Sequence, residues 1–206
     1  MTWWTDNVVP RVNDVSLRGH AVGESRARAC AGLSGRVLEL GFGGGLNLAH
    51  LPPEVVSIGA VEPSDVGWQL SEKRRGRSDV KVERVGLDGQ SVAAPDASYD
   101  AALCTFTLCT IPDALTALAE VRRLVRPGGT FHFLEHGLST EPRVARWQHR
   151  LDPWQQRLAG GCHLTRDTGT LVEQSGMILA WLETGDLPGF SGPAALTYGY
   201  LGVAQV

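Results

Sequence analysis

Residues 36–47 are the most informative part of this chain, and they read Arg36-Val37-Leu38-Glu39-Leu40-Gly41-Phe42-Gly43-Gly44-Gly45-Leu46-Asn47. The first five residues are mostly apolar, which is typical of a short strand, and the glycines that follow predict a tight loop before helix-forming residues resume. Such an arrangement binds nucleotide-like ligands, because glycine has no Cβ and lets the backbone approach a ligand closely. Glu39 lies inside the strand, where an ionised carboxylate needs a partner or a role.

A second acidic residue, Glu62, ends the apolar run at 55–61. A carboxylate about twenty residues beyond a glycine loop, at the end of the second strand, can accept hydrogen bonds from both ribose hydroxyls. The glycine loop alone could be a structural turn, but together with Glu62 it indicates a nucleoside-like ligand.

The glycine spacing favours S-adenosylmethionine over a dinucleotide. The dinucleotide fingerprint places its last glycine where this chain has Leu46. The spacing here is Gly-x-Gly-x-Gly, with Gly41, Gly43 and Gly45. S-adenosylmethionine has no pyrophosphate that must dock on a helix N-terminus. An NAD-dependent oxidoreductase therefore stays as a disfavoured alternative.

At this point the residues resemble the class I S-adenosylmethionine-dependent methyltransferase family. The first motif of that family is a hydrophobic strand with an acidic residue, matched by Glu39, followed by the three glycines, and Glu62 matches its ribose-binding acid. The resemblance implies an α/β, Rossmann-like three-layer sandwich whose seven-stranded sheet is mostly parallel with an antiparallel last strand. It also implies that S-adenosylmethionine is the cofactor and S-adenosylhomocysteine the product.

Strand and helix patterns alternate along the chain, which predicts a mostly parallel sheet covered by helices on both faces. The expected strands are 36–40, 57–62, 80–85, 99–104, 130–135, 177–183 and 195–205, and the expected helices are 16–31, 46–51, 65–75, 112–125, 142–158 and a short one after 165. We expect one methyltransferase domain over residues 1–206. Its expected parts are a helical segment and possible lid at 1–34, a cofactor-binding half at 35–137, and substrate-side helices and closing strands at 138–206.

Further cofactor contacts are expected beyond the glycine loop. Asp88 follows the third strand, where a carboxylate can accept from the adenine amino group and the backbone N–H of Gly89 can reach a ring nitrogen. A turn aspartate is the other interpretation of Asp88. Thr105 and Phe106 match the positions at which the family contacts the methionyl part of the cofactor.

The second half of the chain resembles the methyltransferase-like small-molecule thiol S-methyltransferases. The resemblance rests on Glu135-His136 after the fifth strand, Leu151-Asp152-Pro153, and Gly161-Cys162-His163-Leu164-Thr165-Arg166. It implies a thiol acceptor. A phospholipid amine, another amine or hydroxyl acceptor, and a non-catalytic S-adenosylmethionine-binding module are the alternatives.

A thiol acceptor must lose a proton before it attacks a methyl group. Since a thiol has a pKa of about 8.5, modest electrostatic help suffices. His136 and His163 are the candidate catalytic bases, because histidine titrates near neutral pH. Each could instead be a hydrogen-bonding residue that orients the site.

Composition sets limits on the possible partners and location. The chain has 206 residues, 43% of them hydrophobic, and a net charge of −3, which argues against nucleic-acid binding. Its four cysteines lack zinc-site spacing, so we expect no metal and reduced thiols in the cytoplasm. No segment approaches the ~20 apolar residues of a membrane span, although peripheral membrane contact stays possible. The oligomeric state cannot be inferred.

Overall fold

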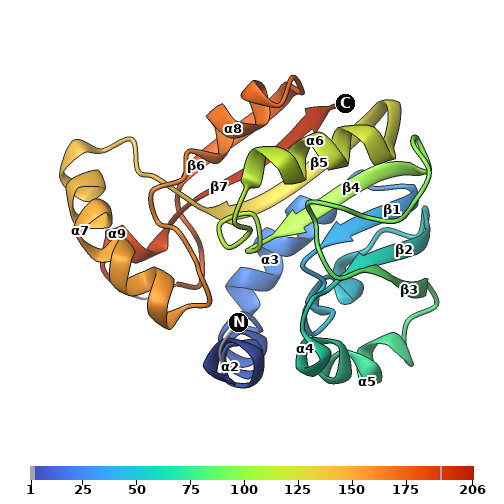
Figure 1. Ribbon diagram of the computed structural model, residues 1–206, viewed down its shortest axis with the longest axis horizontal. Helices are drawn as coiled ribbons and strands as arrows, with labels where there is room; N and C mark the ends of the chain where they lie inside the picture. The colour runs from blue at the N-terminus through green and yellow to red at the C-terminus, as the bar shows by residue number, and fades with distance from the viewer. Residues whose placement is uncertain (1–2, 191) are drawn as a thin grey trace.

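The computed structural model describes residues 3–190 and 192–206, which form one seven-stranded sheet with helices on both faces (Figure 1). The strands are β1 (Gly35–Leu40), β2 (Val55–Val61), β3 (Lys81–Gly86), β4 (Tyr99–Thr105), β5 (Val125–His136), β6 (Ile178–Asp186) and β7 (Tyr198–Gln205). The helices are α1 (Trp3–Asn7), α2 (Val9–Ser16), α3 (His20–Cys30), the 3-10 helix η1 (Leu46–His50), α4 (Asp65–Leu70), α5 (Glu72–Arg75), α6 (Ala114–Leu124), α7 (Pro142–Leu158), α8 (Thr168–Gln174) and α9 (Ala194–Thr197).

The strand order is β3-β2-β1-β4-β5-β7-β6. The pairs from β3 through β5 are parallel, whereas β7 runs antiparallel to both of its neighbours, β5 and β6. The predicted α/β sandwich with a mostly parallel sheet and an antiparallel last strand is therefore confirmed. The order reverses between β1 and β4, which places a ligand-binding crevice outside the carboxyl ends of these two strands.

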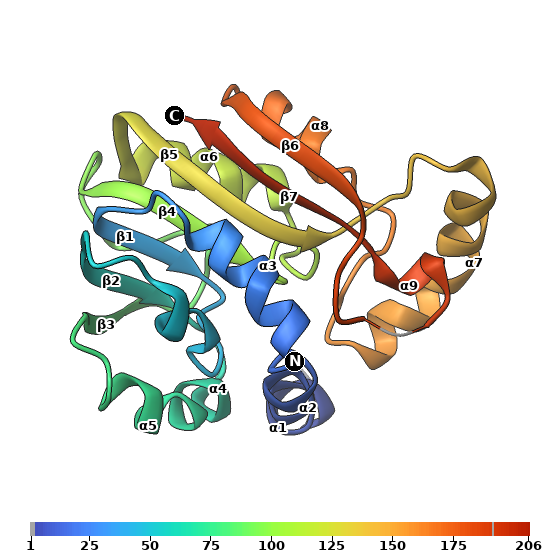
Figure 2. The same cartoon turned by 180° about the vertical axis from the view of Figure 1, so that it is seen from behind.

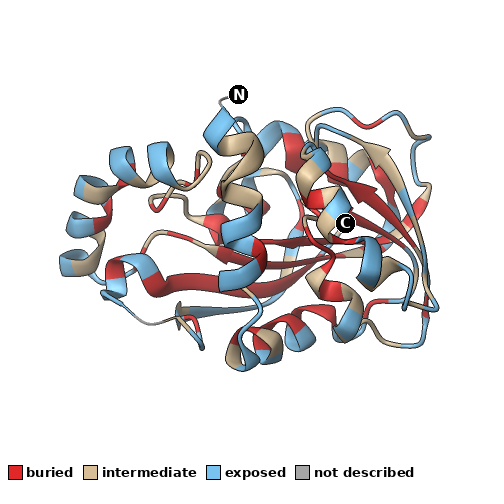
Figure 3. Ribbon diagram, turned by 90° about the horizontal axis from the view of Figure 1, so that it is seen from below, coloured by how far each residue is buried: buried red, intermediate tan, exposed pale blue. Residues whose placement is uncertain are grey.

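Successive residues of the central strands point into two different hydrophobic layers. Val37 and Ala101 pack in the layer under α3, while Leu38 and Ala102 pack in the layer under α6. Buried residues gather in the strands and on the inward faces of the helices (Figure 3). Because both faces are covered, these strands are almost continuously apolar, and Glu39 is a buried exception within β1.

The N-terminal segment contains more structure than the sequence predicted. The single helix expected at 16–31 is α3, preceded by the two shorter helices α1 and α2. Seen from behind, α3 crosses the sheet and α1 and α2 lie beyond the carboxyl ends of the strands (Figure 2). Residues 1 and 2 of the expected 1–34 segment lie outside the described residues.

Several boundaries differ from the predicted ones for local reasons. β5 begins at Val125 rather than at 130, because Val125 already pairs with Tyr99 before an irregularity shifts the register. The helix expected at 65–75 divides into α4 and α5 at Ser71, whose hydroxyl donates to the Trp68 carbonyl at 2.6 Å. Across the described ranges, no helix has both the length and the apolar character needed to cross a membrane.

Candidate active site

The glycine loop after β1 adopts a backbone that other residues rarely accept. Gly41, Gly43 and Gly45 have φ angles of 67°, 54° and 72°. A Cβ at Gly41 would overlap the Thr107 side chain, whereas the nearest atom to a Cβ at Gly43 would be the Gly41 carbonyl oxygen, 3.9 Å away. The space beside Gly43 is therefore open to a ligand, and Gly41 is fixed by packing.

Glu62 follows β2 directly and holds the glycine loop in place. Its carboxylate accepts from the Gly43 N–H at 2.6 Å and from the Ser64 N–H at 2.7 Å. Burial raises the pKa of Glu62, while these two backbone hydrogen bonds counteract that rise. Each oxygen has one such partner, which leaves lone pairs for ligand hydroxyls.

Glu39 anchors a buried polar network beside the loop. Asn47 donates to Glu39 Oε1 at 2.8 Å, while Oε2 is buried with no hydrogen-bond partner among the described residues. Burial raises the pKa of Glu39 to about 7. A buried carboxylate oxygen without a donor is costly, so Glu39 Oε2 has the capacity to accept a hydrogen bond from a further group.

Arg26 completes this network from α3, and the sequence analysis missed it. Its guanidinium donates to Asn47 Oδ1 at 2.7 Å and to Thr105 Oγ1 at 2.8 Å, and it lies 5.2 Å from the Phe106 ring centroid. Burial lowers the pKa of Arg26 to about 10, although the nearby Glu39 carboxylate opposes this effect. Arg26 Nε has no partner among the described residues. No spacing or motif around Arg26 indicates that it is buried.

Of the other predicted cofactor residues, Thr105 and Phe106 contact Arg26, whereas Asp88 lies in an exposed turn. Thr105 ends β4 inside the Arg26 network, and Phe106 follows with a positive φ of 54°. Asp88 is exposed and accepts from the Gln90 backbone N–H at 2.9 Å, as a turn aspartate does. Gly89 lies beside the end of β1, since a Cβ at Gly89 would be 3.3 Å from the Leu40 side chain.

Glu135 is fully buried near the end of β5 and organises the loop that follows β4. Its carboxylate accepts from the backbone N–H groups of Thr107, Leu108 and Cys109 at 2.8, 3.0 and 3.3 Å. Burial raises the pKa of Glu135, and these N–H groups counteract the rise. In the sequence, Glu135 stands out only as part of a resemblance, whereas in the structure its carboxylate holds the backbone of the loop after β4.

His136 ends β5 among aromatic and sulfur-containing side chains. Its ring centroid lies 5.3 Å from that of Phe106 and 5.1 Å from that of Phe190. A ring nitrogen of His136 and the sulfurs of Cys109 and Cys162 all lie within 4.8 Å of one another. The hydrogen bond between the two thiols lowers the pKa of Cys162, an effect that His136 reinforces, and it raises the pKa of Cys109.

The second candidate base, His163, turns its ring toward α7. Its Nδ1 lies 3.0 Å from Gln156 Nε2 and 3.6 Å from Asp152 Oδ2, so this ring nitrogen is already hydrogen-bonded to a side chain of α7. The His163 backbone N–H donates to the Cys109 carbonyl at 2.9 Å. We call the group of Cys109, His136 and Cys162 the sulfur cluster; it contains one of the two candidate bases, whereas the ring of the other, His163, faces α7.

Comparison with known proteins identifies the family. A methyltransferase domain family matches residues 38–133. The human protein named thiol S-methyltransferase TMT1B is 33% identical over 159 residues, which cover 73% of this chain and 64% of that protein. This chain belongs to the class I S-adenosylmethionine-dependent methyltransferases. Its cofactor is therefore S-adenosylmethionine, as the glycine spacing predicted.

Two further comparisons show similarity in sequence and in fold to other methyltransferases. The demethylmenaquinone methyltransferase of Roseiflexus castenholzii is 32% identical over 136 residues, 61% of this chain and 55% of that protein. A solved S-adenosylmethionine-dependent methyltransferase of Thermotoga maritima shares the fold, with a TM-score of 0.67, 19% identity, and coverage of 95% of this chain and 93% of that one. The domain spans less than two thirds of the length of the curated relatives.

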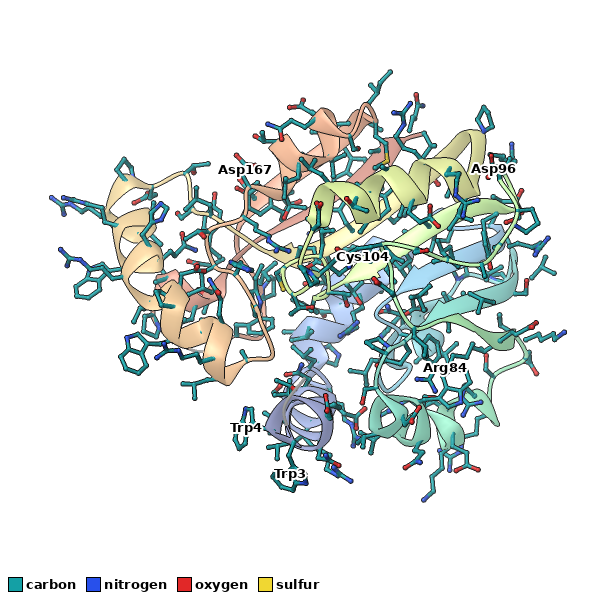
Figure 4. All side chains as sticks on the ribbon, viewed as in Figure 1. Trp3, Trp4, Arg84, Asp96, Cys104 and Asp167 are labelled. Atoms are coloured by element: carbon teal, nitrogen blue, oxygen red, sulfur yellow. The ribbon has the colours of Figure 1, made fainter. Side chains whose placement is uncertain are left out.

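The N-terminal helices of this methyltransferase domain connect its two sides. Arg74 donates to Asp14 of α2 at 2.8 Å and to the Gly44 carbonyl at 2.6 Å, which ties α2 to the glycine loop. At the other side, the Trp4 indole donates to the Leu158 carbonyl of α7 at 3.0 Å. Trp4 lies on the part of the N-terminal helices that faces α7 (Figure 4). These contacts hold α1 and α2 across the end of the sheet at which its parallel strands finish.

Proposed function

We propose that this domain transfers the methyl group of S-adenosylmethionine to a small-molecule thiol. The observation that carries the thiol acceptor is the match to a thiol S-methyltransferase over 73% of the chain. Residues 35–137 make up only half of the chain. A match of that length cannot be confined to the cofactor-binding half, so it includes residues outside 35–137.

The unpartnered buried atoms fit the methionyl part of the cofactor. Glu39 Oε2 is an acceptor without a donor, and Arg26 Nε is a donor without an acceptor. S-adenosylmethionine carries an ammonium and a carboxylate on one carbon atom, so the two groups complement this pair of atoms. Thr105, hydrogen-bonded to Arg26, and Phe106, whose ring packs beside it, extend the same surface.

The nucleoside part is assigned to the loop and to the strands on its β2–β3 side. Gly43, where a side chain would find open space, together with Gly41 and Gly45 lets the adenosine approach the backbone. Glu62 accepts from the ribose hydroxyls with the lone pairs that its backbone partners leave free. We assign the adenine to the turn at Asp88 and Gly89, where the exposed carboxylate is accessible.

When bound, S-adenosylmethionine supplies a methyl group on a positively charged sulfur. The acceptor thiolate attacks that carbon in line with the departing sulfur, and the electron pair of the broken carbon–sulfur bond stays with S-adenosylhomocysteine. The chain must hold the two reactants in this alignment and exclude water. Phe106 and Phe190, whose centroids are 5.6 Å apart, provide an apolar wall beside His136 for that purpose.

Of the two candidate bases, His136 is the better placed to help the acceptor lose its proton. It lies within the sulfur cluster and beside Phe106, which links it to the cofactor side through Arg26. His163 is held by Gln156 and has Asp152 close by, so we assign it to positioning the loop.

An acceptor panel tests this function. The domain is incubated with S-adenosylmethionine and simple alkyl and aryl thiols, a hydroquinone, a phenol and an aminophospholipid in vesicles, and S-adenosylhomocysteine is measured. We expect release with thiols only. Release with hydroquinone alone would move the assignment toward the demethylmenaquinone relatives, and release with the aminophospholipid alone would favour an N-methyltransferase. Calorimetric binding of S-adenosylmethionine without turnover of any acceptor would favour a binding module, whereas tight NAD binding would contradict the cofactor assignment.

A further inference from the structure

The sulfur cluster formed by Cys109, His136 and Cys162 is not explained by packing alone. Cys109 lies in the loop after β4, His136 ends β5, and Cys162 follows α7, so three separate segments bring their ligand atoms together. Both thiols are free and buried. His136 Nε2 is buried and lacks a hydrogen-bond partner among the described residues. Such an unpaired nitrogen in a buried position calls for a partner.

The spacing of the three ligand atoms suits a tetrahedral metal ion. The two sulfurs are 3.4 Å apart, and both lie within 4.8 Å of a ring nitrogen of His136. Zinc–sulfur distances of about 2.3 Å and zinc–nitrogen distances of about 2.0–2.1 Å put tetrahedral ligands roughly 3.5–3.8 Å from one another. Side-chain adjustments of about 1 Å would bring all three atoms to these values.

The backbone around the cluster is held by hydrogen bonds that do not use the ligand atoms. The Cys109 N–H donates to Glu135 at 3.3 Å, and the Cys109 carbonyl accepts from the His163 N–H at 2.9 Å. The Cys162 N–H donates to the Ala159 carbonyl at 3.2 Å. These bonds fix the two cysteine-bearing loops against each other, so the site is preorganised rather than dependent on a flexible segment.

The charges around the cluster can balance a divalent cation. Two thiolates would carry two negative charges, and the buried Glu135 carboxylate and the Arg166 guanidinium contribute one of each sign nearby. Arg166 donates to the carbonyls of Leu108 and Pro112, so its own hydrogen bonds are directed at the backbone. It therefore leaves the sulfurs available for a metal ion.

We propose that Cys109, His136 and Cys162 bind a zinc ion whose fourth position takes the acceptor thiol. Two thiolates and an imidazole form a donor set that zinc prefers. Within residues 3–190 and 192–206, no fourth cysteine, histidine or carboxylate joins this group. Three protein ligands with one open position are typical of catalytic rather than structural zinc sites.

This inference rests on the proposed function and changes one step of it. The acceptor thiol releases its proton to solvent when its sulfur binds the cation, so His136 acts as a zinc ligand and not as the base that accepts this proton. The bound thiolate sulfur then attacks the methyl carbon, and the sulfonium carbon–sulfur bond breaks with its electrons on S-adenosylhomocysteine. The resulting thioether is neutral and a weaker ligand than a thiolate, so it leaves the zinc.

Cobalt substitution tests the site without any need for turnover. The reduced, chelator-treated chain receives one equivalent of Co²⁺, and tetrahedral thiolate coordination is followed by its visible and near-ultraviolet absorption. We expect one cobalt per chain, and a changed spectrum when 2-mercaptoethanol enters the fourth position. X-ray absorption of the zinc-loaded chain should report two sulfur ligands and one imidazole before the thiol is added, and three sulfur ligands afterwards.

Matched variants assign the signal to this cluster. Cys109→Ser, Cys162→Ser and His136→Ala should each weaken cobalt binding by more than the ~10- to 100-fold that loss of an outer-shell partner costs. Cys30→Ser is the control, since Cys30 is also a buried free thiol but ends α3 and is not part of this group. Retention of the cobalt spectrum by Cys162→Ser, or its absence from the unmodified chain, would overturn the proposal.

The outcomes separate this inference from the proposed function. Full thiol methylation by metal-free chain would leave the function standing and overturn the zinc site. A cobalt site that responds to 2-mercaptoethanol in a chain that methylates no thiol would support the site and reject the function. If no metal binds and mild oxidation instead joins Cys109 to Cys162, the cluster is a redox-active pair and the zinc site is wrong.

Discussion

On the cofactor side, the glycine loop and its acidic partners lie close together in sequence, whereas the Arg26–Thr105 pair beside them and the residues of the acceptor side come from distant segments. Glu39 and Asn47 are eight residues apart, and Gly43 and Glu62 are nineteen apart. Cys109 and Cys162 are separated by fifty-three residues. A local motif can be recognised by its spacing, but an arrangement made by folding cannot. The acceptor side therefore has to be understood from contacts.

Glu135 is expected to give the largest effect on the acceptor side, because its carboxylate holds the loop after β4. Glu135→Ala would leave two buried N–H groups and one half-buried N–H group without an acceptor, at about 1–3 kcal/mol each, so we expect the free energy of unfolding to fall by about 3 kcal/mol in urea titrations. Glu135→Gln keeps one acceptor oxygen and should cost less. A loss below about 1 kcal/mol for the alanine variant would show that the β4 loop is held by other contacts.

Glu39 makes the stability of the ligand-free chain depend on pH. Its pKa in the folded state is about 7, above the ordinary value of 4.5, so the folded state disfavours the ionised form. The stability that depends on a protonated Glu39 is complete below about pH 4.5 and is lost as the pH rises through about 7, by on the order of 3 kcal/mol.

Urea unfolding at about pH 5 and about pH 8 measures this effect against Glu39→Gln, which cannot ionise. We expect the wild-type chain to lose more stability between the two values than the variant does. Parallel pH profiles of the two proteins would mean that Glu39 is not the titrating group.

Alanine variants of Gly41 and Gly43 distinguish the stability cost of a Cβ clash from the cost of a positive φ in the glycine loop. Both have positive φ, so Gly41→Ala and Gly43→Ala share a backbone penalty of about 1–3 kcal/mol. Only the Cβ at Gly41 would overlap Thr107. We expect a lower melting temperature for Gly41→Ala than for Gly43→Ala. Equal values would show that Thr107 moves aside without cost.

Glu62 tests the ribose assignment on the cofactor side. Glu62→Ala should weaken S-adenosylhomocysteine binding, measured by calorimetry, by about 1–3 kcal/mol through lost charged hydrogen bonds. Glu54→Ala, an exposed carboxylate just before β2, is the control and should bind normally. Unchanged affinity in Glu62→Ala would remove this residue from the cofactor site.

The smallest expected effect separates the two histidines on the acceptor side. His163→Ala should lower kcat for a thiol acceptor by less than about threefold, while His136→Ala should lower it by at least about tenfold with unchanged cofactor affinity. The reason is that the His163 ring is engaged by α7 and the His136 ring faces the sulfur cluster. A larger effect of His163→Ala would reverse these assignments.

The parts of the molecule that could be predicted are those encoded by short spacing. The strand with Glu39, the glycine loop and Glu62 predicted both the fold and the cofactor, because one continuous segment forms them. Arg26 was missed, since an arginine in a helix of mixed composition gives no sign that it is 4% exposed. The sulfur cluster was missed because zinc spacing was sought along the chain, whereas its members meet only in space.

Phe106 carries a consequence for efforts to stabilise this domain. It is one of two non-glycine residues with positive φ among those described, so a glycine there would relieve about 1–3 kcal/mol of strain. Yet its ring lies against both Arg26 and His136. Phe106→Gly would also remove a ring that packs on the hydrophobic layer under α3 and against Phe190, which costs at least as much as the strain it relieves, so the contacts of this ring hold the backbone in its positive φ.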